Sequence, residues 1–308
     1  MSLGRLREAV PFYKRLKTMY INAEDWSNAS HSDLNLVFLH TYLGTLKPSA
    51  DAAASAVDLA RRAKNKDDEI LSVAIQAWAL HLKGETETAS DLFSQAEKLE
   101  QQDDSSISHL TRNAGVRYAN HLWRTGKTDY ARMVADANLR YCDGNHWGFL
   151  VSRCHCILGD LDADAGQHAS AHEHYDTALK TTRSISYRPA LIEALLARGR
   201  WTAKYMKDAT SAFNDLNEAL GYAVEGGYRI YEADIRVALA WAHLTPIPIP
   251  SPSLPSASLL GPSAVDAVDR GREQARVEAE RALQMSEEMG YYWGKVDAEE
   301  VLNVIRGT

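Results

Sequence analysis

The sequence predicts an all-α protein in which pairs of antiparallel helices stack into a solenoid. The 308 residues are rich in alanine and other helix-favouring types, and prolines are concentrated in one segment. A motif of small, apolar or aromatic, and small residues at i, i+4 and i+7 recurs along the chain, and these positions share one helical face. Recurrence at a period of about 20–50 residues is typical of solenoids.

The motif is clearest at Ala171, Tyr175 and Ala178, with Gly166 five residues before it, where a tight turn between helices favours glycine. In the second helix of each predicted pair, the first small residue of the motif is Ala53, Ala89, Ala131, Ala171, Ala212 or Ala275. The steps between them are 36, 42, 40, 41 and 63 residues, so the last repeat carries an insertion of about 22 residues.

This register predicts a single N-terminal helix, six helix pairs and a final helix. The N-terminal region, 5–30, holds a helix over 5–22 that is either half of a truncated repeat or a simple cap. The repeats occupy 31–244, and 271–308 holds the last repeat helix and a capping helix over 291–306. The pairs are 32–46 with 49–64, 69–82 with 86–101, 107–125 with 128–141, 147–164 with 168–183, 188–206 with 208–224, and 228–244 with 271–289.

A Pro/Ser-rich insertion over 245–270 separates the two helices of the sixth pair. Six of the nine prolines fall between Thr245 and Pro262. Each proline removes an amide donor and disfavours the preceding helical turn, so we expect a flexible loop here. A ligand for a proline-binding partner is the alternative, and the composition favours the loop.

The repeated motif resembles the tetratricopeptide repeat (TPR). Leu158-Gly159 followed by the motif at Ala171 is the closest match, and Ala89, Phe93 and Ala96 give the next. The resemblance implies a right-handed α-α superhelix of about six hairpins plus a capping helix. Small residues let the helices of a hairpin approach closely, and the aromatic fills the gap to the next hairpin.

Repeats of 40–42 residues that open with Gly-Tyr, as at Gly227-Tyr228 and Gly290-Tyr291, resemble the C-terminal arrays of bacterial STAND-type signal-transduction NTPases. That resemblance implies an array that senses a ligand or partner for an upstream NTPase domain. The phosphate-binding motif G-x-x-x-x-G-K-[ST] does not occur in this chain, so such a domain lies outside it.

The TPR resemblance also implies which residues line a concave groove on the first helix of each repeat. Counting from the aligned small residues places eight side chains there: Trp78, Asn113, Asn120, Arg124, Arg153, Trp201, Lys204 and Tyr205. Asparagine can hold a peptide amide, arginine can bind a carboxylate and tryptophan can anchor an apolar side chain. For Trp78 and Trp201, packing between hairpins remains an equal alternative.

Composition excludes several other classes of function. The net charge of -7 and a pI near 5.9 disfavour nucleic acid as a partner. No apolar run approaches the length of a membrane span, so no membrane partner is expected. Three cysteines in a long chain indicate a reducing compartment, and we expect a cytoplasmic location.

Two clusters contain residue types that are used in metal binding or catalysis, but their arrangement supports neither. Cys154-His155-Cys156 lies near further histidines, but two thiols two residues apart on a helix point about 200° apart, which favours buried cysteines over a metal site. Asp160, Asp162 and Asp164 alternate at a helix end and are interpreted as a solvated turn. No nucleophile and base can be paired, so we predict no catalytic residue, metal or cofactor.

The sequence therefore predicts a non-catalytic sensor or scaffold that holds a protein or peptide segment in its groove and belongs to a bacterial signalling protein. The alternative is a structural scaffold that self-associates as a homo-oligomer, attached to an upstream NTPase domain.

Overall fold

A computed structural model describes residues 6–245 and 264–307, apart from the side chains of 264–267, and every regular element in it is helical. The helices are α1 (Leu6–Asn22), α2 (Trp26–Tyr42), α3 (Leu46–Ala63), α4 (Lys66–Leu82), α5 (Thr86–Asp103), α6 (Arg112–Arg124), α7 (Thr128–Gly144), α8 (Gly148–Asp164), α9 (His168–Ser184), α10 (Arg188–Trp201), the π-helix η1 (Thr202–Met206), α11 (Ala209–Gly226), α12 (Arg229–His243), α13 (Ala264–Met289) and α14 (Tyr292–Arg306).

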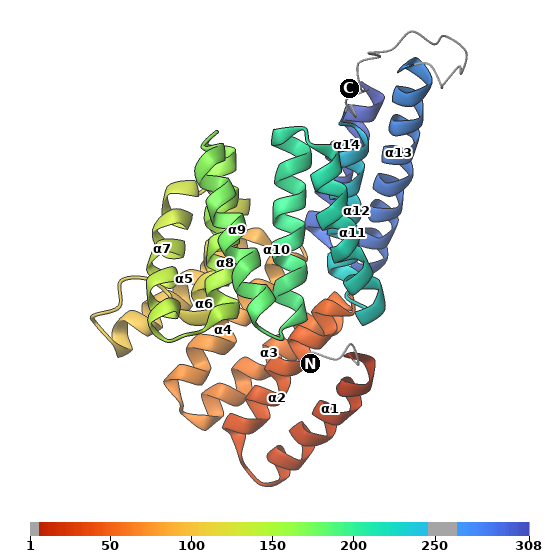
Figure 1. Cartoon of the computed structure of the whole chain (residues 1–308). Helices are drawn as coiled ribbons and strands as arrows, with labels where there is room; N and C mark the ends of the chain where they lie inside the picture. Colours follow the sequence, from red (N-terminus) through yellow and green to blue (C-terminus); the bar gives the residue numbers. More distant parts are fainter. Residues whose placement is uncertain (1–5, 246–263, 308) are drawn as a thin grey trace.

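Consecutive helices form hairpins that stack side by side, as Figure 1 shows. The first helices of the hairpins, α2, α4, α6, α8, α10 and α12, contact one another in order, and α14 continues this inner row. The second helices form the outer row, and α1 packs against α2. The predicted all-α solenoid of six hairpins and a capping helix is confirmed.

The turn inside each of the first five hairpins contains a residue with positive φ. Gly44, Gly84, Gly126 and Gly166 have φ between 71° and 84°, and Lys207 takes the same place in the fifth hairpin at φ 56°. Glycine reaches this region without a clash of its side chain, which explains its recurrence at the turn.

The outer helices share one register, but the first hairpin was predicted one helical turn out of place. Ala89, Ala131, Ala171 and Ala212 each follow the turn residue by five positions. In the first hairpin this place is held by Ser49, which gives steps of 40, 42, 40 and 41 residues. Ala53 is also fully buried, because residues four apart share a helical face, and this explains the wrong alignment.

Helix boundaries differ from the prediction at several points. The helix α2 begins at Trp26, within the region expected to hold only one helix, because Asp25 caps it by accepting a hydrogen bond from the Asn28 amide at 3.1 Å. The helix α13 begins at Ala264, so the last part of the predicted insertion is helical. The proline-rich part, 246–263, lies outside the described residues.

The third hairpin begins later than predicted, at Arg112, because side chains bind the preceding backbone. Glu100 accepts hydrogen bonds from the amide and hydroxyl of Thr111, and Asn138 donates to the Leu110 carbonyl at 2.8 Å. Gly115 makes room for this turn, since a Cβ there would lie 2.0 Å from the Leu110 oxygen. These contacts replace helical hydrogen bonds that the chain would otherwise make.

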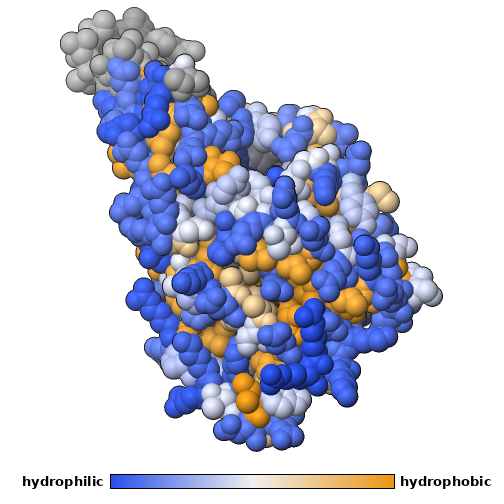
Figure 2. All heavy atoms as spheres, turned by 180° about the vertical axis from the view of Figure 1, so that it is seen from behind, coloured by the Kyte–Doolittle hydropathy of each residue, from blue (hydrophilic) through white to orange (hydrophobic). Residues whose placement is uncertain are grey.

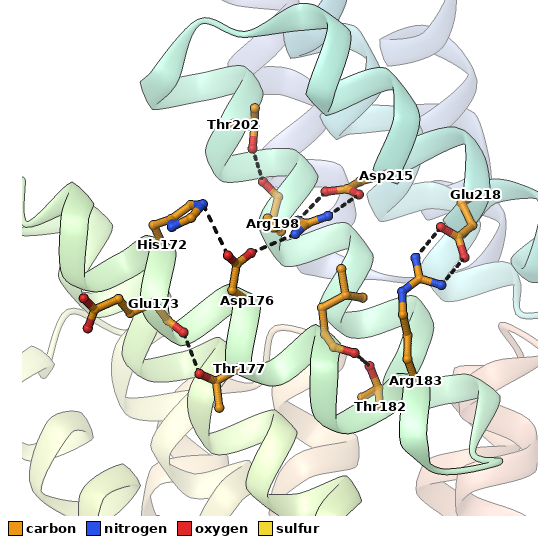
Figure 3. Close-up of polar contacts among 11 residues, drawn as sticks. His172, Glu173, Asp176, Thr177, Thr182, Arg183, Arg198, Thr202, Asp215 and Glu218 are labelled. Atoms are coloured by element: carbon orange, nitrogen blue, oxygen red, sulfur yellow. Dashed lines mark hydrogen bonds and ion pairs between the residues drawn. The ribbon is translucent and has the colours of Figure 1, made fainter.

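Ion pairs on the outer side join neighbouring hairpins. Figure 3 shows Arg198 of α10 between Asp176 of α9 and Asp215 of α11, with nitrogen to oxygen distances of 2.7–2.8 Å. Arg183 and Glu218 form a second link between α9 and α11. The Asp215 side chain is nearly buried, so its bidentate pairing with Arg198 contributes more than the exposed Arg183 pair.

The packing at Gly159 gives a test of the repeat register. A Cβ at this position would lie 2.7 Å from the ring of Tyr175, which is fully buried and fixed by a hydrogen bond to Asp160. We expect Gly159→Ala to lower the free energy of unfolding by about 1–3 kcal/mol, measured by urea denaturation.

Gly144→Ala is the matched control, because Gly144 is also helical and a Cβ there would meet nothing within 4 Å. We expect this variant to be unchanged or more stable by up to about 1 kcal/mol. Equal stability of the two variants would contradict the close approach of α8 and α9.

Candidate functional site: the inner channel

Three cavities follow one another along the inner row of helices, and together they form the inner channel. The N-terminal cavity, about 440 Å³, lies at the first turns of α2, α4, α6 and α8 and is lined by residues such as Leu71, Asn113 and Trp147. The central cavity, about 170 Å³, includes Trp78, Arg117 and Arg153. The C-terminal cavity, about 300 Å³, includes Trp201 and Lys204. Phe38 lines the first two, and Arg124, Arg200 and three further residues line the last two.

Contacts between distant helices close the channel on itself. The Tyr42 ring of α2 lies 5.4 Å from that of Tyr228, just before α12. Trp293 of α14 donates a hydrogen bond to the His81 carbonyl of α4 at 3.0 Å and stacks on the His81 ring. The inner row therefore curves until its end meets its beginning.

All eight residues named from the sequence line this channel. Asn113 lies in the N-terminal cavity. Trp78, Asn120, Arg124 and Arg153 line the central cavity. Trp201, Lys204 and Tyr205 line the C-terminal cavity, and Arg124 lines it as well. Trp78 and Trp201 are also at least nine-tenths buried, so each of them both packs between helices and lines the channel. The role of the eight residues in binding remains a prediction.

Each cavity contains one buried polar atom that has no hydrogen-bond partner among the described residues. These are Oδ1 of Asn113, Nε of Arg117 and Nε1 of Trp201, in order along the channel. A buried polar group without a partner costs about 1–3 kcal/mol, so such groups are uncommon unless they serve a purpose. One acceptor and two donors without partners therefore belong to side chains that line the three cavities.

Charged residues line the central cavity in two layers. On α6, α8 and α10 the pairs Arg117 and Arg124, Arg153 and Asp160, and Glu193 and Arg200 are each seven residues apart. Seven residues are two helical turns, or about 10 Å along the axis. The upper layer is defined here as Arg117, Arg153 and Glu193, and the lower layer as Arg124, Asp160 and Arg200 with Asp234 and Asp297.

In the upper layer Glu193 is already fully engaged. Arg153 donates two hydrogen bonds to it, at 2.5 and 2.9 Å, and the Tyr231 hydroxyl donates a third. Burial alone would raise the pKa of Glu193, but Arg153 and then Arg117 hold that pKa below its usual value. Arg117 has no ion pair with any described residue, and its guanidinium lies 4.5 Å from the Trp78 ring centre.

In the lower layer one ion pair joins the neighbouring helices α8 and α10, and a second crosses the channel. Arg200 binds both oxygens of Asp160 at 2.8 Å, and Arg124 binds Asp297 of α14 at 2.7 Å. The Arg124 guanidinium also lies 4.3 Å from the centre of the Trp293 ring, which fixes α14 against α6.

Asp234 is the carboxyl of the lower layer that lacks an ion pair. It accepts only a hydrogen bond from the Tyr291 hydroxyl at 3.3 Å. Burial, and next the nearby Asp297, raise the pKa of Asp234 to about 7 against the opposing effects of Arg124 and Arg200. This carboxyl therefore carries only part of a charge at neutral pH.

The C-terminal cavity is shaped by the π-helix η1, which extends α10. The predicted helix over 188–206 changes at Thr202 from α to π geometry, and Lys204 and Tyr205 lie on this turn. The Tyr205 hydroxyl donates to Asp164 at 2.6 Å, and Lys204 pairs with Glu300 at 2.8 Å. Short π segments are frequent at functional sites because they redirect side chains.

The interpretation of the three aspartates as a solvated turn is wrong for two of them. Asp160 and Asp162 are buried, and Asp162 binds Arg132 at 2.6 Å. Only Asp164 is exposed, and it accepts a hydrogen bond from Trp123 at 2.8 Å. Residues two apart on a helix point to nearly opposite sides, so each carboxyl meets a different neighbouring helix.

The cysteines are buried, as the sequence predicted. Cys142, Cys154 and Cys156 are all free thiols, and burial raises the pKa of Cys156 above its usual range. Among the described residues no group of three or more histidine, cysteine or acidic side chains could hold a metal ion.

The sequence missed more than half of the charged residues that line the central cavity. Arg117, Glu193 and Arg200 lie on predicted inner helices. Pairs of charged residues seven positions apart recur in three successive repeats, and this spacing could have identified them. Asp297 had no such signal, because it reaches the channel only when α14 closes on α6.

The outer surface differs from the channel. Figure 2 shows hydrophobic residues gathered in a band across the middle of the back face, between hydrophilic regions. No helix in the described part of the chain is both long and apolar enough to cross a membrane.

Comparison with known proteins supports the fold. No protein-family model and no curated protein sequence matches the chain. A solved structure of a Rap protein complexed with Competence and Sporulation Factor is similar, with a TM-score of 0.61 over 97% of this chain and 80% of that chain, at 11% identity. BtubC (BKLC) from P. vanneervenii gives a TM-score of 0.49, covering 80% of this chain and 93% of that chain at 15% identity. The likeness to the Rap protein shows a TPR-like helical-repeat fold.

The raised pKa of Asp234 gives a test by pH. An acid whose pKa is raised on folding stabilises the protein at low pH and loses that contribution as the pH rises through the folded value. We expect Asp234→Asn to gain stability relative to the wild type as the pH rises from about 4 to about 8, reaching about 1–3 kcal/mol at the upper end.

The measurement is urea denaturation over this pH range. Asp297→Asn is the control, because it leaves Arg124 without its ion pair and should lower stability near neutral pH. A wild type and an Asp234→Asn variant with the same pH dependence would contradict the assignment.

Proposed function

We propose that the protein is a non-catalytic binding module whose inner channel holds a peptide or an extended protein segment. The observation that supports this most is the set of three unpartnered buried polar atoms, one in each cavity. A ligand with donors and acceptors along its length, as a peptide backbone has, could satisfy them in turn.

Two asparagines on α6 match the geometry of an extended chain. Asn113 and Asn120 are seven residues apart, so they lie about 10 Å apart along the helix, which is the length of about three extended residues. Asn120 makes no hydrogen bond to any described residue, and Oδ1 of Asn113 has none either. An asparagine amide can pair with both groups of a peptide bond.

The solved relative gives independent support. The Rap protein that shares this fold was determined in complex with Competence and Sporulation Factor. A role as the sensing part of a bacterial signalling protein in the cytoplasm is the more specific form of the proposal, and it comes from the resemblance to arrays of signal-transduction NTPases.

The experiment is selection of short random peptides on the purified protein, followed by affinity measurement. We expect enriched peptides that bind Asn113→Ala and Asn120→Ala about tenfold or more weakly than the wild type, since each variant loses hydrogen bonds to the ligand. Glu87→Ala on the outer helix α5 is the control, because Glu87 is exposed and distant from the cavity-lining residues. No enrichment, or equal binding by all variants, would contradict the proposal.

The band of hydrophobic residues on the back face favours a second candidate, a scaffold that self-associates. Light scattering across a range of protein concentrations tests it. A concentration-dependent mass with an unchanged peptide affinity would add this role to the first, and a constant monomer mass would remove it.

A further inference from the structure

The upper layer of the central cavity carries one more cation than anion. The upper layer holds two cations, Arg117 and Arg153, and one anion, Glu193. Because Arg153 binds Glu193 through two hydrogen bonds, Arg117 is the cation left over. It is 9% exposed, and removing an arginine from water without a counterion is costly.

Arg117 lines the central cavity and has no ion pair with a described residue. The Trp78 ring covers one face of the guanidinium at 4.5 Å, a contact that holds the side chain but uses no N–H group. Its Nε is buried and has no hydrogen-bond partner, and no ion pair joins it to a described residue. A guanidinium held in this way is preorganised to bind a planar anion through two parallel hydrogen bonds.

The surrounding charges limit what that anion can be. The upper layer has a net charge of about one positive unit, which one carboxylate would neutralise. In the lower layer Asp160, Asp234 and Asp297 oppose Arg124 and Arg200, so a second negative charge would meet an acidic surface. A monoanion therefore fits better than a doubly charged phosphate.

The size of the cavity sets a further limit. Its volume of about 170 Å³ is close to the roughly 150 Å³ of an apolar cavity that holds one benzene molecule. It can therefore hold one side chain or one chain end, while the larger cavities on either side hold the neighbouring parts of the ligand.

From these observations we infer that Arg117 is the specificity-determining residue of the channel and binds a carboxylate of the peptide ligand, from an acidic side chain or the C-terminus. This inference rests on the proposed function and adds the chemical class of the ligand group at the central cavity. Trp78 positions the Arg117 guanidinium. Glu193 does not neutralise Arg117, because it is paired with Arg153.

The test uses small probes and tryptophan fluorescence, because Trp78 lies against the Arg117 guanidinium and two further tryptophans, Trp123 and Trp293, line the same cavity. The probes are N-acetyl-glutamate amide, with a side-chain carboxylate, N-acetyl-alanine, with a terminal carboxylate, the neutral N-acetyl-glutamine amide, and inorganic phosphate. We expect at least one carboxylate to bind tenfold or more tightly than the glutamine amide, and the tighter of the two identifies the source of the carboxylate.

Arg117→Gln should lose this binding by about tenfold or more, and Arg117→Lys should retain part of it. Arg183→Gln is the matched control, since it removes one cation from the exposed outer helix α9 and should bind as the wild type does. Arg117→Gln should also unfold at a temperature no lower than the control, because it removes an uncompensated buried charge.

Equal binding of the carboxylate and amide probes, tighter binding of phosphate, unchanged binding by Arg117→Gln, or unfolding of that variant well below the control would each overturn the inference. If selected peptides still bind through Asn113 and Asn120, the proposed function stands without it. If carboxylate probes bind but no peptide is enriched, the proposed function fails and the carboxylate site remains.

Discussion

Close approach of neighbouring helices at small residues is the constraint on which this structure depends. Fully buried residues such as Ala89, Ala131 and Ala171 let each outer helix pack directly against its partner. The same packing supports the channel, because the Tyr175 ring fits against Gly159 and its hydroxyl binds Asp160, which in turn holds Arg200. The repeat motif thus positions a channel carboxylate as well as the hairpin.

The inner row of helices closes on itself, so the helices surround the cavities on the concave face. Solenoids often present an open concave surface, since each repeat contacts only its neighbours. Here α12 returns to α2, and α14 reaches α4 and α6 through Trp293 and Asp297. The enclosed side chains lose water, so charges inside must be paired or shifted in pKa. Most of the charged residues that line the central cavity are paired, and Arg117 and Asp234 are the two with no ion pair to a described residue.

The sequence predicted which residues lie on the inner face, but not which charged residues at its centre form ion pairs. Counting from the aligned alanines placed Trp78, Asn120 and Arg153 on the channel, because helical periodicity fixes which face a residue occupies. It could not show that Arg153 forms an ion pair with Glu193 while Arg117 forms none with a described residue, since this depends on side chains from different helices.

The sequence by itself determined the all-α class, the stacking of six hairpins with a capping helix, and the turn glycines, because these follow from local periodicity and the backbone freedom of glycine. Only the tertiary structure decided the place of Ser49 in the register and the closure of the inner row. The curvature of the array sums small rotations between successive repeats, and contacts such as Arg124 with Asp297 join residues 173 positions apart, where no local pattern can act.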